Sequence, residues 1–207
     1  MAATESEVAA AFKRAGQYRI QRAYELAGVG APDGISGSLI LALGLRETGL
    51  RNIEGGAKWD PVRNRWVGLG PEDAHIMDVG ALQIARRWNP AVLKALPAVK
   101  VGTWAPVVPG KTPYDLGYAP RWTDSLRVAI RELQEGADFA RDNGITGDDA
   151  IRFAVAAYNA GQGGALSGYR AGNVDKYTAM GDYSAWVLAT RTVVNHWLGK
   201  HPNWITG

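Results

Sequence analysis

The sequence predicts a mostly α (α+β) domain that contains one small β-hairpin. Near both ends of the chain, apolar residues recur at helical spacing, and capping residues or glycines bound these stretches. Between them lies a segment rich in glycine, proline and tryptophan, where only two short pieces have the character of strands. The 207 residues suffice for one buried core, so we expect a single domain over 1–207.

The first expected helix is an N-terminal extension within residues 1–34. It covers Glu5 to Ala27 and ends at glycines and a proline: Gly28, Gly30 and Pro32. Helical spacing predicts the following buried positions in it: Val8, Phe12, Ala15 and Ala23.

The second expected helix ends on an acidic residue that continues an apolar face. Ser36 or Ser38 caps its start, and Gly49 ends it. Along one face, at i, i+4 and i+8, stand Leu39, Leu43 and Glu47. A carboxylate therefore extends a leucine stripe, which makes Glu47 the first candidate functional residue.

The middle of the chain predicts little regular structure. Two pieces that contain Trp and Val flank Arg63-Asn-Arg within residues 55–70, which indicates a small β-hairpin. We expect a short helix from Gly80 to about Trp88. Residues 89–122 hold six prolines and are expected to form an irregular insertion.

Regular helical spacing returns after this insertion. One helix is predicted over 126–140, capped by Thr123 or Asp124 and stopped by Gly144. A second opens at Asp148 or Asp149, runs over 151–159 and stops at Gly161. The last spans Tyr183 to Leu198, with these residues facing inward: Val187, Thr190, Val194 and Trp197.

Composition excludes several classes of function. The chain has no cysteine, and its three histidines lack metal-ligand spacing, so we expect no metal and no cofactor. The net charge is +3, but the basic residues are scattered, which argues against nucleic acid as the partner and favours another polyanion. No apolar stretch is long enough to cross a membrane, so we expect no membrane insertion.

The position of Glu47 suits acid catalysis. Partial burial on the leucine face and the negative end of the helix both disfavour the charged carboxylate, and are expected to raise its pKa. Arg46 and Arg51 oppose this effect if they fold back. A carboxylic acid that keeps its proton near neutral pH can protonate a leaving oxygen, as glycosidic cleavage requires.

Three segments in the same order resemble those of goose-type lysozymes and the related lytic transglycosylases. They are Leu45-Arg-Glu-Thr-Gly-Leu, Asp78-Val-Gly-Ala-Leu-Gln-Ile and Ala156-Ala-Tyr-Asn-Ala-Gly. The closing part, with Tyr177, Met180 and Asp182-Tyr before the final helix, extends the resemblance over roughly residues 35–198. The resemblance implies a lysozyme-like fold in which a substrate cleft runs between the hairpin and the helices.

The resemblance also implies roles for individual residues. Glu47 matches the general acid, and Gln83 matches a glutamine at the floor of the sugar cleft. Tyr158 is expected to hold the Glu47 carboxyl, and Asn159 to bind an N-acetyl or hydroxyl group of a sugar. Trp66 is a candidate for stacking on a sugar ring, although loop tryptophans also simply fill cores.

Two aspartates are candidates for the second carboxylate of a hydrolase. An inverting hydrolase needs a base about 6.5 to 9.5 Å from the acid. Ala85 stands where these lysozymes have their later aspartate, which leaves Asp73 and Asp78 as candidates, with Asp73 slightly preferred. Asp78 equally suits a helix cap at Gly80. A lytic transglycosylase needs no second carboxylate, because the 6-hydroxyl of the sugar attacks and Glu47 serves as acid and then as base.

The expected substrate is therefore the peptidoglycan glycan strand, cut at the β-1,4 bond between N-acetylmuramic acid and N-acetylglucosamine. Two alternatives stay open: a lytic transglycosylase, and an inactive wall-binding or structural module. We expect a monomer without a secretory signal, because the N-terminus lacks a basic region followed by an apolar core. This combination suggests a bacteriophage endolysin or virion-associated lysin, made in an infected cell and acting on the wall after release or from the phage particle.

Overall fold

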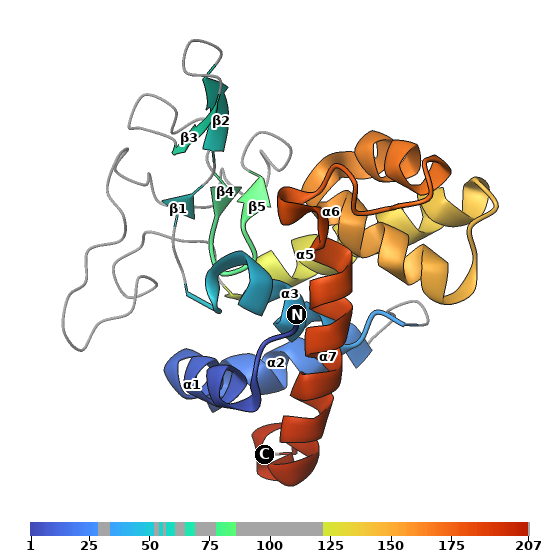
Figure 1. The fold of residues 1–207 in the computed structure, drawn as a ribbon. Helices are drawn as coiled ribbons and strands as arrows, with labels where there is room; N and C mark the ends of the chain where they lie inside the picture. The colour runs from blue at the N-terminus through green and yellow to red at the C-terminus, as the bar shows by residue number, and fades with distance from the viewer. Residues whose placement is uncertain are drawn as a thin grey trace. The chain divides into compact units, whose positions relative to one another are not determined.

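The computed structural model describes residues 1–28, 34–51, 54–55, 57–60, 65–68, 78–85 and 122–206 (Figure 1). Contacts divide the chain into two compact units. The first, the helical unit, consists of residues 1–50 and 126–207, and the second, the middle unit, of residues 51–125. The prediction of a mostly α protein is confirmed.

The N-terminal stretch forms two helices, so the prediction of one continuous helix is wrong. They are α1 (Glu5–Ala15) and α2 (Gln17–Gly28). Gly16 separates them with a φ of 85°, a conformation that a helix interior does not allow, and its N–H closes α1 on the Phe12 carbonyl. At the other end of α1, Thr4 and Glu7 form a reciprocal capping box.

Helix α3 (Gly37–Thr48) is the buried centre of the helical unit. Ser36 caps it, as the sequence indicates, and Gly49 ends it in the left-handed conformation. Its residues from Leu39 to Leu43 are all buried, so it is apolar on every side and packs against both α2 and α7. Gly37 allows the close approach to α2, since a Cβ there would stand 2.8 Å from the Tyr24 Cα.

The described strands of the middle unit are short. Strand β2 (Ala57–Asp60) pairs antiparallel with β3 (Arg65–Gly68), and the register places Trp59 opposite Trp66. Strand β4 (Asp78–Val79) lies between β1 (Glu54–Gly55) and β5 (Ile84–Ala85), antiparallel to both.

The prediction of a short helix from Gly80 to about Trp88 is wrong over residues 80–85, the part of this range that the structure describes. Residues 80–83 form a turn between β4 and β5, with Gly80 at a φ of 82° and Gln83 at 48°. Left-handed residues at both ends of this turn do not allow a helix to start. Asp78 is consequently a strand residue, and not the cap of a helix.

Helices α5 (Trp122–Asp142) and α6 (Gly147–Arg170) follow. Helix α5 starts earlier than predicted, so Thr123 and Asp124 lie inside its first turn. Thr146, not Asp148 or Asp149, is the N-cap of α6. Gly161 breaks the helical path of α6 as predicted, with φ 72° and ψ 160°, but the chain resumes a helix up to Arg170.

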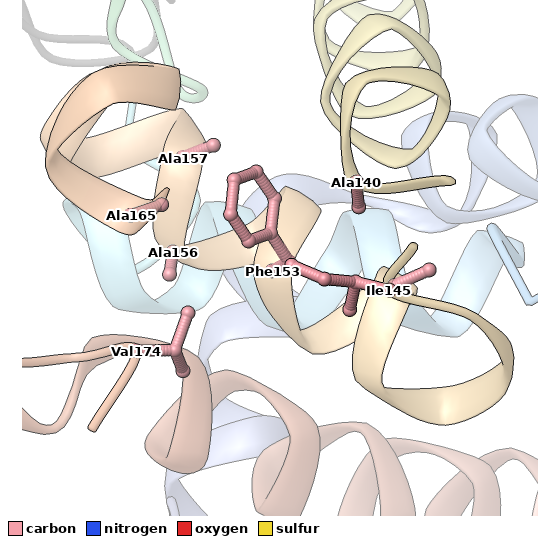
Figure 2. Packing of buried hydrophobic residues seen from close by; sticks show 8 residues of the cluster. Ala140, Ile145, Phe153, Ala156, Ala157, Ala165 and Val174 are labelled. Atoms are coloured by element: carbon pink, nitrogen blue, oxygen red, sulfur yellow. The ribbon is translucent and has the colours of Figure 1, made fainter. Parts of the chain in front are cut away.

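The core of this region is a cluster around Phe153, which Figure 2 shows from close by. Its buried members come from α5, α6 and the segments beside them: Ala140, Ile145, Ala150, Phe153, Ala156, Ala157, Ala165 and Val174. Phe139 of α5 stacks on Phe153 with ring centroids 6.0 Å apart. Small alanines on α6 therefore let one large aromatic fill the space between helices.

Helix α7 (Tyr183–Lys200) is the red helix in Figure 1 and confirms the predicted final helix. Its predicted inward positions are all buried: Val187, Thr190, Val194 and Trp197. No helix among the residues described by the structure has the length and apolar character needed to span a bilayer.

Candidate active site

The half-buried Glu47 lies in the last turn of α3 and is bound by a tyrosine of α7. The hydroxyl of Tyr183 donates a hydrogen bond to Oε1 of Glu47. Tyr183 is only 2% exposed and is the first residue of α7, which packs along α3. Two helices that meet through their apolar faces thus fix one oxygen of the carboxylate.

The environment keeps the Tyr183 hydroxyl protonated. Burial raises the pKa of Tyr183 well above its ordinary value of 10.0, and the negative charge of Glu47 and the hydrogen bond to it act in the same direction. Tyr158 adds a smaller upward contribution to this pKa, whereas the guanidinium of Arg46 opposes it. Across the neutral range Tyr183 is therefore a permanent donor to the carboxylate.

Arg46, the neighbour of Glu47, forms a second link between α3 and α7. Its guanidinium bonds Oδ1 of Asp182 at 2.7 Å and lies 5.1 Å from the ring centroid of Trp186. The Arg46 side chain is 18% exposed, so the pair is partly shielded from water. Arg46 thus bonds Asp182 and lies over the rings of Trp186 and Tyr183, the latter at 5.7 Å from the ring centroid.

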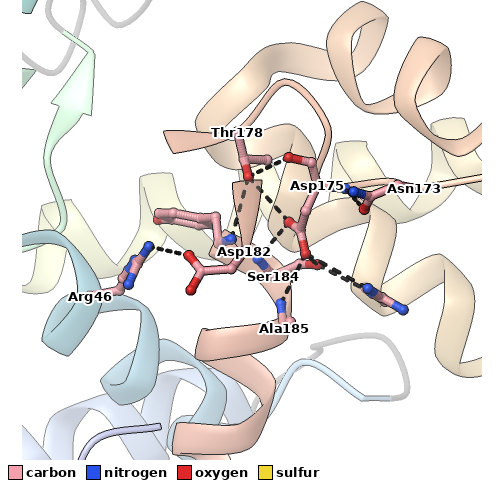
Figure 3. Close-up of polar contacts among 9 residues, drawn as sticks. Arg46, Asn173, Asp175, Thr178, Asp182, Ser184 and Ala185 are labelled. Carbon is pink, nitrogen blue, oxygen red and sulfur yellow. Dashed lines mark hydrogen bonds and ion pairs between the residues drawn. The ribbon is translucent and has the colours of Figure 1, made fainter. Parts of the chain in front are cut away.

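A buried carboxylate holds the start of α7, as Figure 3 shows. Asp175, which is 1% exposed, accepts the backbone N–H groups of Ser184 at 2.7 Å and Ala185 at 3.2 Å, and also the Ser184 hydroxyl at 2.7 Å. The guanidinium of Arg152 lies 3.7 Å from Oδ2, the carboxylate oxygen that accepts the Ala185 N–H and the Ser184 hydroxyl. Asp175 therefore caps α7 from outside the helix and fixes the position of Tyr183.

The segment that precedes α7, residues 176–181, is fastened at its centre. Oδ1 of Asn159 accepts the N–H of Ala179 at 2.7 Å. The Thr178 hydroxyl donates to the Asp175 carbonyl at 2.9 Å and accepts the N–H of Tyr183 at 3.4 Å. Asn159, predicted to bind a sugar, thus holds this segment through its amide oxygen.

The structure brings three residues of the helical unit close enough to interact: Glu47, Tyr158 and Tyr183. Tyr158 was expected to hold the Glu47 carboxyl, and the structure assigns a hydrogen bond of this kind to Tyr183. In the sequence, the only indication that Tyr183 belongs to the site is the Asp182-Tyr pair in the closing part of the resemblance.

The remaining predicted site residues belong to the middle unit. Gln83 is half-buried and donates from its side-chain Nε2 to the Gly80 carbonyl at 2.9 Å, so it braces its own turn. Asp78 pairs with Gly55 and Ala85 in the small sheet, and Trp66 lies in β3. Asp73 lies outside the described residues, as do residues 89–121 of the expected insertion.

Arg46 and Asp175 are site residues that sequence reasoning missed or left open.

Among the residues described, no group of three or more acidic or histidine side chains is placed to hold a metal ion. Comparison with known proteins gives no match to this chain among family models, curated proteins or solved structures. The function therefore has to be argued from the residues themselves.

Proposed function

We propose that this chain is a peptidoglycan-cleaving glycosidase of the lysozyme type, with Glu47 as its general acid. One observation supports it above the others: a half-buried carboxyl whose orientation is set by a hydrogen bond from a buried tyrosine hydroxyl. The order of the three sequence segments and the helical character of the chain agree with this proposal. Peptidoglycan is the proposed substrate, and its β-1,4 bond between N-acetylmuramic acid and N-acetylglucosamine is the proposed point of cleavage.

Glu47 would give its proton to the glycosidic oxygen as the bond to the anomeric carbon breaks. Tyr183 binds one oxygen of this carboxyl and helps to orient the group for the transfer. Packing of α3 on α7 sets the direction of the carboxyl before substrate arrives. Such preorganisation reduces the cost of orienting the acid in the transition state.

The second step separates two forms of the proposal. In a hydrolase, Asp73 or Asp78 takes a proton from water, and the resulting hydroxide adds to the anomeric carbon. In a lytic transglycosylase, the 6-hydroxyl of the muramic acid adds instead, and the Glu47 carboxylate accepts its proton. The Asp182 carboxylate pairs with Arg46 and is therefore a poor choice for the base in either form.

Mass spectrometry of soluble products from purified peptidoglycan tests this function, with wild type and Glu47→Gln in parallel. We expect reducing-end muramic acid products from wild type and at least a hundredfold less from Glu47→Gln. Anhydro-muramic products, lighter by one water, would assign the transglycosylase and remove the need for an aspartate base.

Absence of both products from wild type would contradict the enzyme and favour a wall-binding module of the same fold. A pull-down with insoluble walls then separates a binder from a protein without affinity for the wall. The same proposal includes where the protein acts. It would reach the wall from outside the producing cell, either after release from an infected bacterium or as part of a phage particle.

A further inference from the structure

Exposed apolar side chains with no role in the proposed proton transfer lie in the segment that immediately precedes α7 in the sequence. The described residues include five large hydrophobic side chains that are exposed: Met1, Tyr18, Tyr169, Tyr177 and Met180. Two of them, Tyr177 at 55% and Met180 at 90% exposure, belong to the segment 176–181. This segment ends two residues before Tyr183, the partner of Glu47.

The exposure does not come from a loosely held backbone. Ala179 is bound to Asn159, and Thr178, which is only 8% exposed, is bound to Asp175 and to the N–H of Tyr183. Polar contacts at Thr178 and Ala179 thus lie between two exposed apolar side chains, Tyr177 and Met180. A backbone fixed in this way presents the two side chains at defined positions relative to Glu47.

Met180 also adopts a backbone conformation that its side chain disfavours. Its φ is 65° and its ψ is 0°, in the left-handed region where glycine is the residue without a steric penalty. The fold obtains little packing in return, because the side chain is 90% exposed. Disfavoured backbone together with an unburied apolar side chain is typical of a contact with a ligand.

The chemistry of these two side chains fits a sugar. The C–H face of a pyranose ring packs on an aromatic ring, and a flexible thioether adapts to a methyl group such as that of an N-acetyl substituent. Lys176 lies over the Tyr177 ring at 5.5 Å from its centroid, which helps to hold the ring in place.

We propose that Tyr177 and Met180 form an apolar platform that binds an N-acetylated pyranose of the glycan strand next to the bond cleaved by Glu47. This inference rests on the proposed function, because the sugar must lie beside the acid. Both side chains are specificity-determining contacts, separate from the proton transfer.

Steady-state kinetics on soluble, stem-free glycan oligomers tests the platform, with Met180→Gly, Tyr177→Ala and the control Tyr18→Ala. Tyr18 lies far from the proposed site. Its neighbour Gln17 donates a hydrogen bond to the carbonyl of Asn203, which follows the C-terminal end of α7, and that helix is about 27 Å long from Tyr183 to Lys200. We expect about a five- to tenfold higher KM for each platform variant with kcat changed less than twofold, and no change for Tyr18→Ala.

Thermal unfolding of the same variants separates binding from folding. Met180→Gly removes the disfavoured conformation, so its Tm should equal or exceed that of wild type while its KM rises. An unchanged KM for both platform variants, with normal products from wild type, would overturn the platform and leave the proposed function standing. If wild type gives no product and the Glu47→Gln variant does not bind the oligomers, both the platform and the proposed function would be overturned.

Discussion

At the scale of single residues, the contact between Glu47 and Tyr183 determines how the site responds to pH. A hydrogen bond from a neutral donor stabilises the ionised carboxylate, and a hydrogen bond to a charged group contributes about 1.5–3 kcal/mol. The hydroxyl cannot ionise at neutral pH, because burial and Glu47 raise the pKa of Tyr183. The donor is thus present throughout the working range of the proposed enzyme.

Tyr183→Phe removes this donor and keeps the ring. The carboxylate form of Glu47 then loses stabilisation, so the acid form persists to higher pH. We expect the alkaline limb of the kcat/KM profile to move up by about one pH unit. A profile measured from pH 4 to 9 checks this result, with Tyr18→Phe as control. An unmoved limb would mean that the hydroxyl does not stabilise the carboxylate.

Tyr183 also links folding to alkaline pH. Its pKa is raised in the folded state, so the contribution is complete below about pH 10 and is lost as the unfolded chain ionises above it. We expect the free energy of unfolding to fall above pH 10 by about 1.4 kcal/mol per pH unit from this group. Urea titrations at several pH values measure it, and Tyr183→Phe should show a shallower decline than wild type.

The sequence singles out Glu47 as a candidate, but it does not indicate the hydrogen bond from Tyr183. A carboxylate at i+8 of a leucine stripe is a local pattern, which periodicity detects. The hydrogen bond to Tyr183 joins residues 136 positions apart, and nothing in the spacing within either helix encodes that pairing. The sequence favours Tyr158 for this role because it stands in one of the three recognisable segments, whereas Tyr183 belongs only to the closing part of the resemblance.

At the scale of elements, the start of α7 is held by a residue outside that helix. Asp182 occupies the N-cap position but forms no side-chain cap, since its carboxylate binds Arg46. Asp175 receives the backbone N–H groups of the first turn instead. This exchange ties α7 both to the segment before it and to α3.

Truncation of the two aspartates should therefore have unequal effects. Asp175→Ala leaves two helix N–H groups and the Ser184 hydroxyl without their buried acceptor, and we expect a loss of about 2–4 kcal/mol in the free energy of unfolding. Asp182→Ala removes a partly exposed ion pair, and a loss below about 1 kcal/mol is expected. Urea unfolding of both variants checks this order, and equal losses would contradict it.

Helices with clear periodicity were predictable, and their boundaries at glycines were less so. The break at Gly16 was missed because apolar spacing continues through it, and only the backbone conformation reveals it. The turn at residues 80–83 was not predicted, because a short apolar run is equally compatible with a helix and with short strands, and the sequence pattern alone does not distinguish the two. Gly161 was predicted as a stop, and it breaks α6 without ending it.

At the scale of the whole molecule, the helical character was predictable from the two ends of the chain, but the division into two units was not. The hydrogen bonds that join Glu47 to Tyr183, and Asp175 to the start of α7, lie within the helical unit, although the chain leaves that unit at Leu50 and returns at Leu126. Such assembly depends on contacts between distant segments, which a single sequence does not display. Gln83, Asp73 and Asp78 therefore stay predictions based on resemblance.

The net charge supplies a test that involves the whole chain. With a charge of +3, the protein should associate more strongly with a polyanionic wall, and salt should screen that attraction. We expect Glu47→Gln to bind peptidoglycan severalfold more weakly at 0.5 M than at 0.05 M NaCl, measured by co-sedimentation. Walls whose stem carboxyls are converted to amides are the matched control and should remove most of the salt dependence. Equal salt dependence on both walls would show that the wall carboxylates do not attract the protein, and recognition would then rest on the uncharged parts of the glycan.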